Sequence, residues 1–234
     1  MKNLILGSTS TVYATGYLEH LKDTISIHFK EAKEIVFIPF ARPGGRSHDS
    51  YTEHARPFFN ELGIYLKGIH EFEDPAAALQ KAQGIFTGGG NTFVLVNALY
   101  QNNLLEPLRR AIFAGVPYLG TSAGSNIAGV TMHNTNDMPI VHPPSFKTLG
   151  AIPFNINAHY QDPDPNSKHM GESRETRIKE FHTQQNIPVV GIREGSWLQV
   201  TGEQCVLKGP HTARIFRKNS QPYEAQPECF LEFS

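Results

Sequence analysis

Short runs of apolar and β-branched residues recur along the 234-residue chain, with more polar segments between them. Their length and composition are typical of buried strands. These runs cover residues 3–7, 34–40, 64–69, 84–87, 117–120, 154–158 and 188–192. The pattern therefore predicts a sheet whose strands are spread over most of the chain.

Apolar residues at helical spacing mark several of the intervening segments. The groups are Leu18, Leu21 and Ile25, then Leu95, Ala98 and Leu99, and then Leu108, Ile112 and Phe113. Asp74 before Pro75 predicts a further helix start, and Ser173 opens another amphipathic stretch. Strands and helices thus alternate to about residue 195. This alternation predicts an α/β fold with a mainly parallel sheet and helices on both faces.

The pattern changes after residue 194. Residues 197–200 and 205–207 are short apolar runs around a turn at 201–203, and a third run follows at 213–216. This spacing predicts an antiparallel C-terminal hairpin region at a sheet edge. Because no linker, repeat or low-complexity tract interrupts the chain, we expect residues 1–234 to form one domain.

A formal net charge of −1 leaves no basic field to attract nucleic acid or an anionic membrane. A small neutral or zwitterionic ligand is more compatible with this net charge. The apolar run at the N-terminus is too short for a secretory signal, so we expect a cytoplasmic protein, either a monomer or a homodimer. Cys205 and Cys229 lack the spacing of a disulfide framework or zinc site and are interpreted as structural.

The most informative motif is Gly120-Thr121-Ser122-Ala123-Gly124, which joins a predicted strand to helix-compatible residues. Gly-x-Ser-x-Gly in this context is typical of a nucleophile elbow, in which a tight turn exposes the serine hydroxyl. Ser122 is therefore a candidate nucleophile. The alternative is a simple turn with Ser122 as a helix N-cap.

A second glycine-rich loop, Gly88-Gly89-Gly90-Asn91-Thr92, follows the strand at 84–87. It lacks the lysine of a phosphate-binding P-loop. Its amides suit an oxyanion hole, in which the amide of Ala123 and those of Gly89 and Gly90 are the candidate donors. The alternative is a helix-entry turn.

A serine nucleophile needs a base, and eleven histidines are present. His159 is favoured because it ends the strand at 154–158, where an α/β sheet gathers its ligand site. Most of the other histidines are expected at the surface. Glu194, which follows the strand at 188–192, is the preferred carboxylate to orient His159, and Asp137 is the alternative. The order Ser122, His159, Glu194 differs from that of α/β-hydrolases.

A metal site can also be drawn from His169, His182, Asp162 and Asp164, but their spacing matches no compact ligand motif. We therefore expect no metal.

Six blocks of sequence, in order, resemble the peptidase E family, aspartyl dipeptidases whose fold is related to class I glutamine amidotransferases. The blocks are Gly88 to Thr92, Ser122 to Gly124, Thr135 to Val141, Asn155 to His159, Gly171 to Arg177, and Glu194 to Trp197. Amidotransferases carry cysteine at the elbow and a later His-x-Glu pair, whereas this chain has serine.

The resemblance implies a class I amidotransferase-like or flavodoxin-like fold and hydrolysis of dipeptides with an N-terminal aspartate, without metal or organic cofactor. It points to Arg174 as the ligand of the aspartyl carboxylate, with Arg177 able to share or replace that role. Asp137 or a nearby asparagine such as Asn91 is the candidate acceptor for the α-ammonium group.

The chain departs from the family at Arg42 and Arg46, which add charge after the second predicted strand. They are loop residues or they affect the leaving side of the dipeptide. Two further functions stay open at this point. One is a cyanophycinase-like hydrolase of an aspartate–arginine polymer, and the other is a noncatalytic module that binds an acidic ligand or a partner protein.

Overall fold

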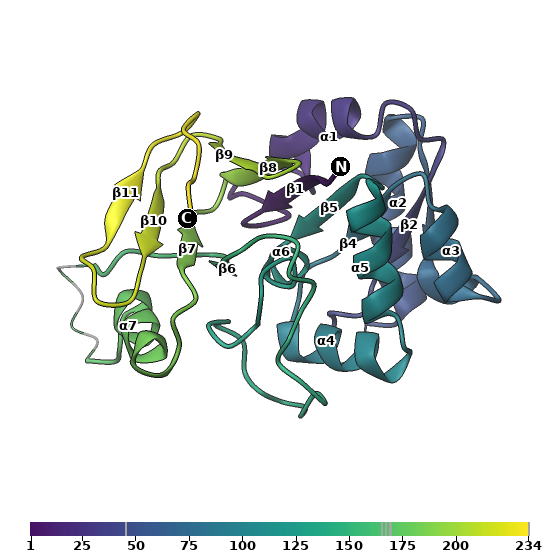
Figure 1. Cartoon of the computed structure of the whole chain (residues 1–234). Coiled ribbons are helices and arrows are strands. Elements are labelled where there is room, and N and C mark those ends of the chain that lie inside the picture. Colours follow the sequence, from purple (N-terminus) through teal and green to yellow (C-terminus); the bar gives the residue numbers. More distant parts are fainter. Residues whose placement is uncertain (45, 165, 167, 169, 234) are drawn as a thin grey trace.

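The computed structural model of the chain describes residues 1–44, 46–164, 166, 168 and 170–233. A seven-stranded sheet forms the larger half, in the order β3-β2-β4-β5-β1-β8-β9 (Figure 1). Its strands are β1 (Asn3–Gly7), β2 (Glu34–Ile38), β3 (Tyr65–Gly68), β4 (Ile85–Thr87), β5 (Tyr118–Thr121), β8 (Trp197–Thr201) and β9 (Gln204–Lys208). Strands β1 to β5 are parallel, and β8 and β9 continue the sheet as the predicted antiparallel hairpin.

A second sheet of four strands, in the order β11-β10-β7-β6, lies beyond β8 and β9. Its members are β6 (Asn155–Asn157), β7 (Val189–Ile192), β10 (Ala213–Phe216) and β11 (Tyr223–Ala225). The strands predicted at 154–158 and 188–192 are therefore real, but they do not join the main sheet as we expected. The strand at 213–216 also belongs to this second sheet. Hydrophobic patterning defines a strand but not its partner, which depends on contacts distant in sequence.

The helices lie on both faces of the larger sheet, as the alternating pattern predicts. They are α1 (Lys22–His28), α2 (His48–Glu61), α3 (Pro75–Lys81), α4 (Thr92–Gln101), α5 (Leu105–Ala114) and α6 (Ala123–Asn126), with short 3-10 turns η1 (Glu19–Leu21) and η2 (Ile69–Glu71). A further helix, α7 (Arg174–Gln184), packs on the smaller sheet instead. Side chains alternate along a strand, so successive residues of β1 contact the helices on opposite faces of the sheet. Ile5 packs with α1 and α2, whereas Leu4 and Leu6 pack with α3, α4 and α5.

Local capping explains several helix starts. The side chains of Asp74 and Ser173 accept hydrogen bonds from the backbone amides of Ala77 and Thr176, which confirms both predicted N-caps. Phe113 differs from the expectation, since 43% of its surface is exposed. Its position follows directly after Ile112, so it points away from the buried stripe of α5. Helix α2 and strand β11 were not predicted.

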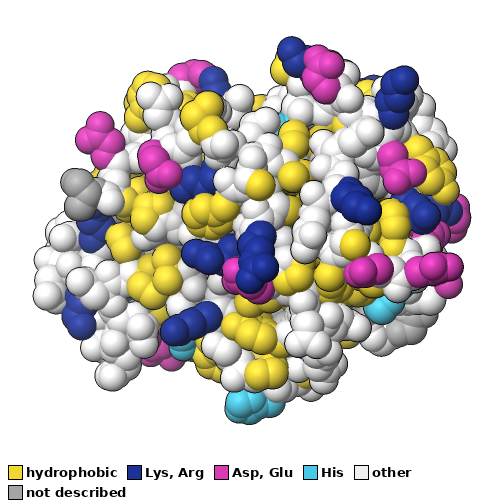
Figure 2. All heavy atoms as spheres, turned by 45° about the vertical axis from the view of Figure 1, so that its right-hand side comes forward, with side chains coloured by type: hydrophobic (Ala, Val, Ile, Leu, Met, Phe, Trp, Pro, Cys, Tyr) yellow, Lys and Arg dark blue, Asp and Glu magenta, His cyan; other side chains and the backbone are white. Residues whose placement is uncertain are grey.

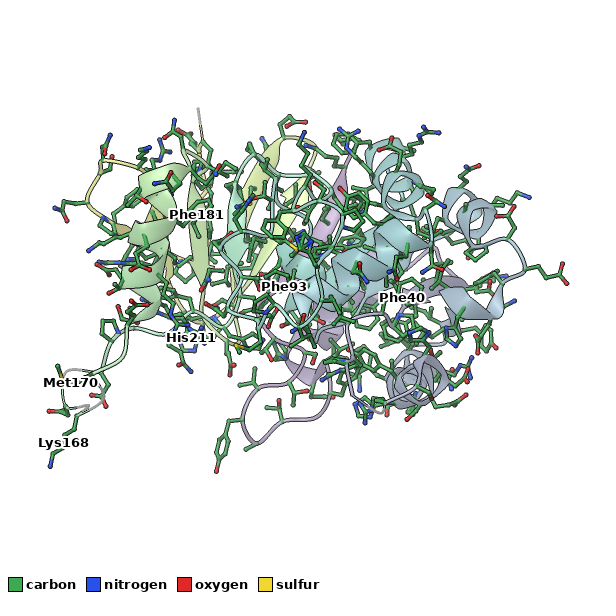
Figure 3. All side chains as sticks on the ribbon, turned by 90° about the horizontal axis from the view of Figure 1, so that it is seen from below. Phe40, Phe93, Lys168, Met170, Phe181 and His211 are labelled. Atoms are coloured by element: carbon green, nitrogen blue, oxygen red, sulfur yellow. The ribbon has the colours of Figure 1, made fainter. Side chains whose placement is uncertain are left out.

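Acidic and basic side chains both occur over the face drawn in Figure 2. Seen from below, Phe181 and His211 lie toward the smaller sheet, and Phe40 and Phe93 toward the larger one (Figure 3). Lys168 and Met170 project away from the body. No helix in the described part of the chain is long and apolar enough to cross a membrane.

Parallel strands bring their carboxyl ends to one edge of a sheet, where α/β proteins place ligands. At this edge β1 is followed by Ser8, β2 by the segment that contains Arg42, β4 by the loop around Gly89, and β5 by Ser122. Four loops that are distant in sequence thus share one location.

Candidate active site

Ser122 occupies a sharp turn between β5 and α6. Its φ of 53° and ψ of −113° lie outside the favoured regions for a residue with a side chain, a strain that clusters at functional sites. The turn is closed by Gly120 and Gly124. A Cβ at Gly120 would lie 2.5 Å from the Gly124 oxygen, and one at Gly124 would lie 2.2 Å from the Thr87 oxygen. Ser122 makes no side-chain cap bond, so the elbow describes this turn better than an N-cap does.

His159 connects Ser122 to Glu194. The Nε2 atom of His159 lies 2.9 Å from Ser122 Oγ, and its Nδ1 atom lies 2.6 Å from Glu194 Oε1. Asp137 takes no part in this chain of hydrogen bonds. Its carboxylate instead accepts bonds from the Thr92 amide at 2.8 Å and the Thr135 hydroxyl at 2.9 Å. The contact expected of the orienting acid is therefore made by Glu194.

Ser8 joins the two sheets beneath His159. Its hydroxyl is fully buried, accepts a hydrogen bond from the His159 amide at 2.9 Å and donates one to the Ile192 carbonyl at 2.7 Å. Sequence analysis missed this residue. The available signal was its place directly after β1, at the same edge as the other site residues.

Two asparagines, Asn126 and Asn136, hold the strand end that precedes His159. Asn126 Oδ1 accepts a bond from the Ala158 amide at 3.3 Å, and Asn136 Nδ2 donates to the Ala158 carbonyl at 3.1 Å. Asn136 also donates to Asn157 Oδ1 at 3.1 Å. Both backbone groups of Ala158 are thus fixed, which restricts where the His159 ring can lie.

The glycine-rich loop packs directly on Ser122. A Cβ at Gly89 would lie 2.9 Å from Ser122 Cβ and 3.6 Å from Ser122 Oγ, so a larger residue would crowd the hydroxyl. Neither Gly89 nor Gly90 donates its amide to an acceptor within the described part of the chain. Ala123 opens α6, and amides in a first helical turn have no partner within the helix. Donors are therefore available beside the serine.

Arg174 is the first residue of α7 and is half-buried. Burial and the neighbouring Arg177 lower the pKa of its guanidinium, and the charge of Asp137 acts in the opposite direction. Among the described residues, no carboxylate lies within 4.0 Å of Arg174, whereas Arg177 faces Glu172 at 3.7 Å. A pocket of about 280 Å³ opens beside both arginines. Arg174 thus offers a cation that no carboxylate of the described residues neutralises.

Asn91 and Asp137 both secure the start of α4. Asn91 Oδ1 accepts a bond from the Val94 amide at 3.1 Å, and its Nδ2 donates to the Met138 carbonyl at 2.9 Å. Asp137 binds the Thr92 amide, as described above. The structure therefore places these two candidate substrate ligands next to each other, each with polar contacts inside the chain.

The residues of the possible metal site are engaged elsewhere. Asp162 pairs with Arg193 at 2.8 Å, and Asp164 accepts a bond from the Asn166 amide. His182 is buried rather than solvated, with Nε2 2.9 Å from the Ile187 carbonyl. His169 lies outside the described residues.

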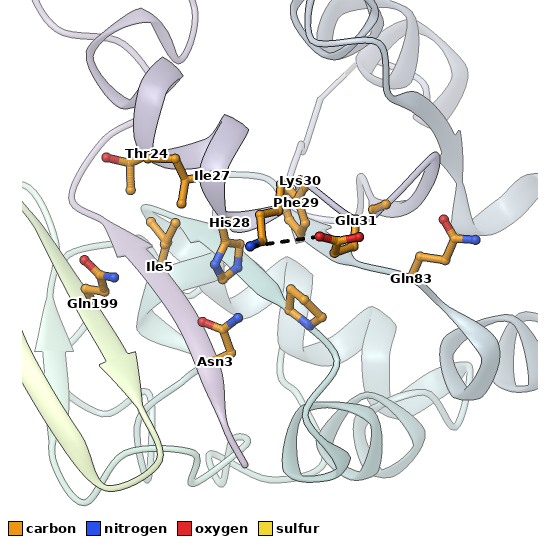
Figure 4. Close-up of a pocket in the computed structure, with 12 residues that line it drawn as sticks. Asn3, Ile5, Thr24, Ile27, His28, Phe29, Lys30, Glu31, Gln83 and Gln199 are labelled. Carbon is orange, nitrogen blue, oxygen red and sulfur yellow. Dashed lines mark ion pairs between the residues drawn. The ribbon is translucent and has the colours of Figure 1, made fainter.

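A pocket of about 370 Å³ lies at the opposite, amino-terminal ends of the strands (Figure 4). Asn3 and Pro117 line it beside His28, and an ion pair joins Lys30 to Glu31 within it. Burial lowers the pKa of His28 to about 4. None of the candidate site residues belongs to this pocket.

A serine, a histidine and a carboxylate in one hydrogen-bonded chain, beside unpaired backbone amides, define a serine hydrolase type of site. The model of peptidase family S51 matches residues 4–208. The chain therefore belongs to peptidase family S51 and is a serine peptidase.

Relatives support this assignment along the chain. Peptidase E of Streptomyces coelicolor is 48% identical over 222 residues, which cover 95% of this chain and 90% of that protein. A probable alpha-aspartyl dipeptidase of Drosophila melanogaster is 43% identical over 235 residues, which cover 99% and 97%. The crystal structure of a peptidase from an acI-B1 Actinobacterium shares the fold, with a TM-score of 0.75 and 17% identity over 100% of this chain and 97% of that one. The predicted α/β fold is thereby confirmed.

Proposed function

We propose that this peptidase hydrolyses dipeptides with an N-terminal aspartate through an acyl-enzyme on Ser122. The observation that carries the proposal is the chain of hydrogen bonds from Ser122 through His159 to Glu194. His159 would accept the serine proton and return it to the leaving amine. Glu194 would hold the ring orientation and stabilise the imidazolium.

The oxyanion of the tetrahedral intermediate is assigned to the amides of Ala123, Gly89 and Gly90. Their support is the absence of acceptors for the two glycine amides in the described residues and the close packing of Gly89 on Ser122. Water activated by His159 then attacks the acyl-enzyme and releases aspartate. Every step of this proposed reaction uses only side chains and amides of this chain, together with water.

The aspartyl side chain is assigned to Arg174, because its guanidinium is half-buried and lacks a carboxylate partner among the described residues. Arginine holds a carboxylate with two parallel hydrogen bonds. The α-ammonium group is assigned to Asp137, with Asn91 beside it. The name of the Drosophila relative, a probable alpha-aspartyl dipeptidase, favours the same substrate.

Domain organisation, location and oligomeric state are also proposals. We assign a single domain to residues 1–234, because one hydrophobic core contains Leu4 of the larger sheet and Val190 of the smaller. We further propose a cytoplasmic monomer or homodimer with no nucleic-acid partner, in keeping with a net charge of −1.

The test is hydrolysis of aspartyl p-nitroanilide by the wild type and by S122A. We expect S122A to lose at least about a thousandfold in kcat while its thermal melting stays unchanged. Chelator should leave the wild-type rate intact. Full activity in S122A would overturn the nucleophile assignment. Binding of aspartyl dipeptides without products would favour a binding module, and release of aspartyl-arginine from polymer would favour a cyanophycinase-like enzyme.

A further inference from the structure

Two arginines near Ser122 have no role in the mechanism above. Arg42 and Arg46 lie in the segment between β2 and α2. The residue before Arg42 packs on the glycine-rich loop: the Ala41 carbonyl accepts a bond from the Asn91 amide at 2.7 Å, and a Cβ at Gly90 would lie 2.1 Å from this oxygen. The side chain of Arg42 therefore begins one residue away from a contact with the loop that borders the nucleophile.

Both guanidinium groups lie against Tyr51. The ring centre of Tyr51 is 4.8 Å from the Arg42 guanidinium carbon and 5.8 Å from that of Arg46. Tyr51 itself is fully buried, and its hydroxyl donates to the Gly89 carbonyl at 3.2 Å. Tyr51 thus fixes two positive charges next to the loop that packs on Ser122.

Nothing in the described part of the chain neutralises these charges. No carboxylate there lies within 4.0 Å of Arg42 or Arg46, whereas Arg56 and Arg193 each pair with two carboxylates. The Nε atom of Arg42 is buried without a hydrogen-bond partner among the described residues. A buried charged donor without an acceptor is costly, so a bound anion would stabilise the arrangement.

Two further side chains near the arginines, Tyr17 and His54, supply polar atoms that carry no negative charge. The rings of Tyr17 and His54 are in contact, with centres 4.8 Å apart. The Tyr17 hydroxyl is buried and has no partner within the described residues. Burial, Arg46 and Arg42 together lower the pKa of His54. The surroundings of the arginines therefore suit a carboxylate.

A dipeptide substrate carries a carboxylate at the required place. The α-carboxylate of the leaving residue lies one residue, about 3.5 Å, beyond the scissile carbonyl. Arg174 comes from α7 beside the smaller sheet, whereas Arg42 and Arg46 follow β2 of the larger sheet (Figure 1). Arg174 and the pair formed by Arg42 and Arg46 are thus held by different parts of the fold.

We propose that Arg42 and Arg46 bind the α-carboxylate of the leaving residue, so that the enzyme selects free dipeptides over blocked or longer peptides. This inference rests on the proposed aspartyl dipeptidase activity. Arginine suits the role because its fork of donors matches both oxygens of a carboxylate. The contact is lost once the leaving amine departs, so it acts on acylation alone.

The test compares Asp-Ala with Asp-Ala amide, two substrates that differ only in this carboxylate. We expect the wild type to prefer Asp-Ala by about tenfold or more in kcat/KM, the range for hydrogen bonds between charged groups. In R42Q and R46Q the ratio of the two kcat/KM values should fall toward one. R42K should keep part of the preference, because it retains the charge but not the fork.

R110Q is the matched control, since it removes one positive charge from the exposed surface of α5, away from the cluster. It should keep the wild-type ratio. A wild-type ratio near one, or an unchanged ratio in both R42Q and R46Q, would overturn the inference. If R42Q fails to fold, R46Q tests the assignment on its own, and a wild-type ratio near one overturns it without any variant. If neither substrate is cleaved, the proposed function itself fails.

Discussion

Ser8 offers a direct test of how the two sheets hold the active site together. In S8A the buried His159 amide loses the acceptor it has in Ser8, whereas the Ile192 carbonyl keeps a hydrogen bond from the Tyr160 amide at 3.0 Å. Each buried polar group left unpaired costs about 1–3 kcal/mol. We therefore expect the free energy of unfolding to fall by about 1–3 kcal/mol, which lowers Tm by about 3–12 °C in a chain of this size.

The same change should slow catalysis. His159 loses a backbone anchor, and a misplacement of about 1 Å in a catalytic group costs about a hundredfold in rate. Thermal melting and steady-state kinetics on an aspartyl dipeptide measure both effects. We expect the loss in kcat with little change in KM, because Ser8 lies below His159 and not beside the assigned substrate ligands.

Ser196 provides the matched control. Its hydroxyl is also fully buried. It accepts a hydrogen bond from a backbone amide and donates one to a backbone carbonyl, but both groups belong to His211. S196A should lose a similar amount of stability and retain much more activity than S8A. If S8A melts within about 2 °C of the wild type, or if S196A loses as much kcat as S8A, the reasoning is wrong.

Three further predictions follow from the geometry. E194Q keeps the shape of the carboxylate but not its charge, so kcat should fall by about 100- to 10,000-fold with unchanged thermal melting; a loss below threefold would contradict the role of Glu194. G89A places a Cβ 2.9 Å from Ser122 Cβ, and we expect kcat to fall by about 100-fold in steady-state assays, as on loss of an oxyanion donor. Desolvation of its half-buried ring lowers the pKa of His28 to about 4. This pKa lies below the value of about 6.5 in the unfolded chain, so the unfolded state takes up the proton first. Stability should then be full above about pH 6.5 and decline by up to about 3 kcal/mol as the pH falls to 4, and urea unfolding should show a flatter profile in H28Q.

Local patterns were sufficient for most strands and for the helices with clear caps. The prediction failed where pairing depends on distant residues. Nothing in the run at 154–158 distinguishes a strand of the larger sheet from one of the smaller, because both are buried on each side. Helix α2 was missed because Pro57 lies within it and its composition is polar, although Tyr51, Ala55 and Phe59 recur every four residues on its buried side.

The candidate site was predictable to the extent that each residue follows a strand. His159 and Glu194 were chosen on that ground, and Ser122 on its Gly-x-Ser-x-Gly motif after a strand; the structure brings the three side chains into contact. Ser8 follows a strand as well, but a lone serine has no motif. Its two hydrogen bonds are with residues 151 and 184 positions away in the sequence. Such a bridge becomes visible only once the sheets are placed side by side.

The order of the three residues is a consequence of this two-sheet arrangement. β6 and β7 are parallel neighbours, with Asn157 paired to Gly191, so the segments that follow them emerge together. The pairing of these two strands brings His159 and Glu194 close together within the smaller sheet. Only Ser122 has to reach them from β5. The site is therefore complete only where the two sheets meet, and the buried hydroxyl of Ser8 lies at that junction.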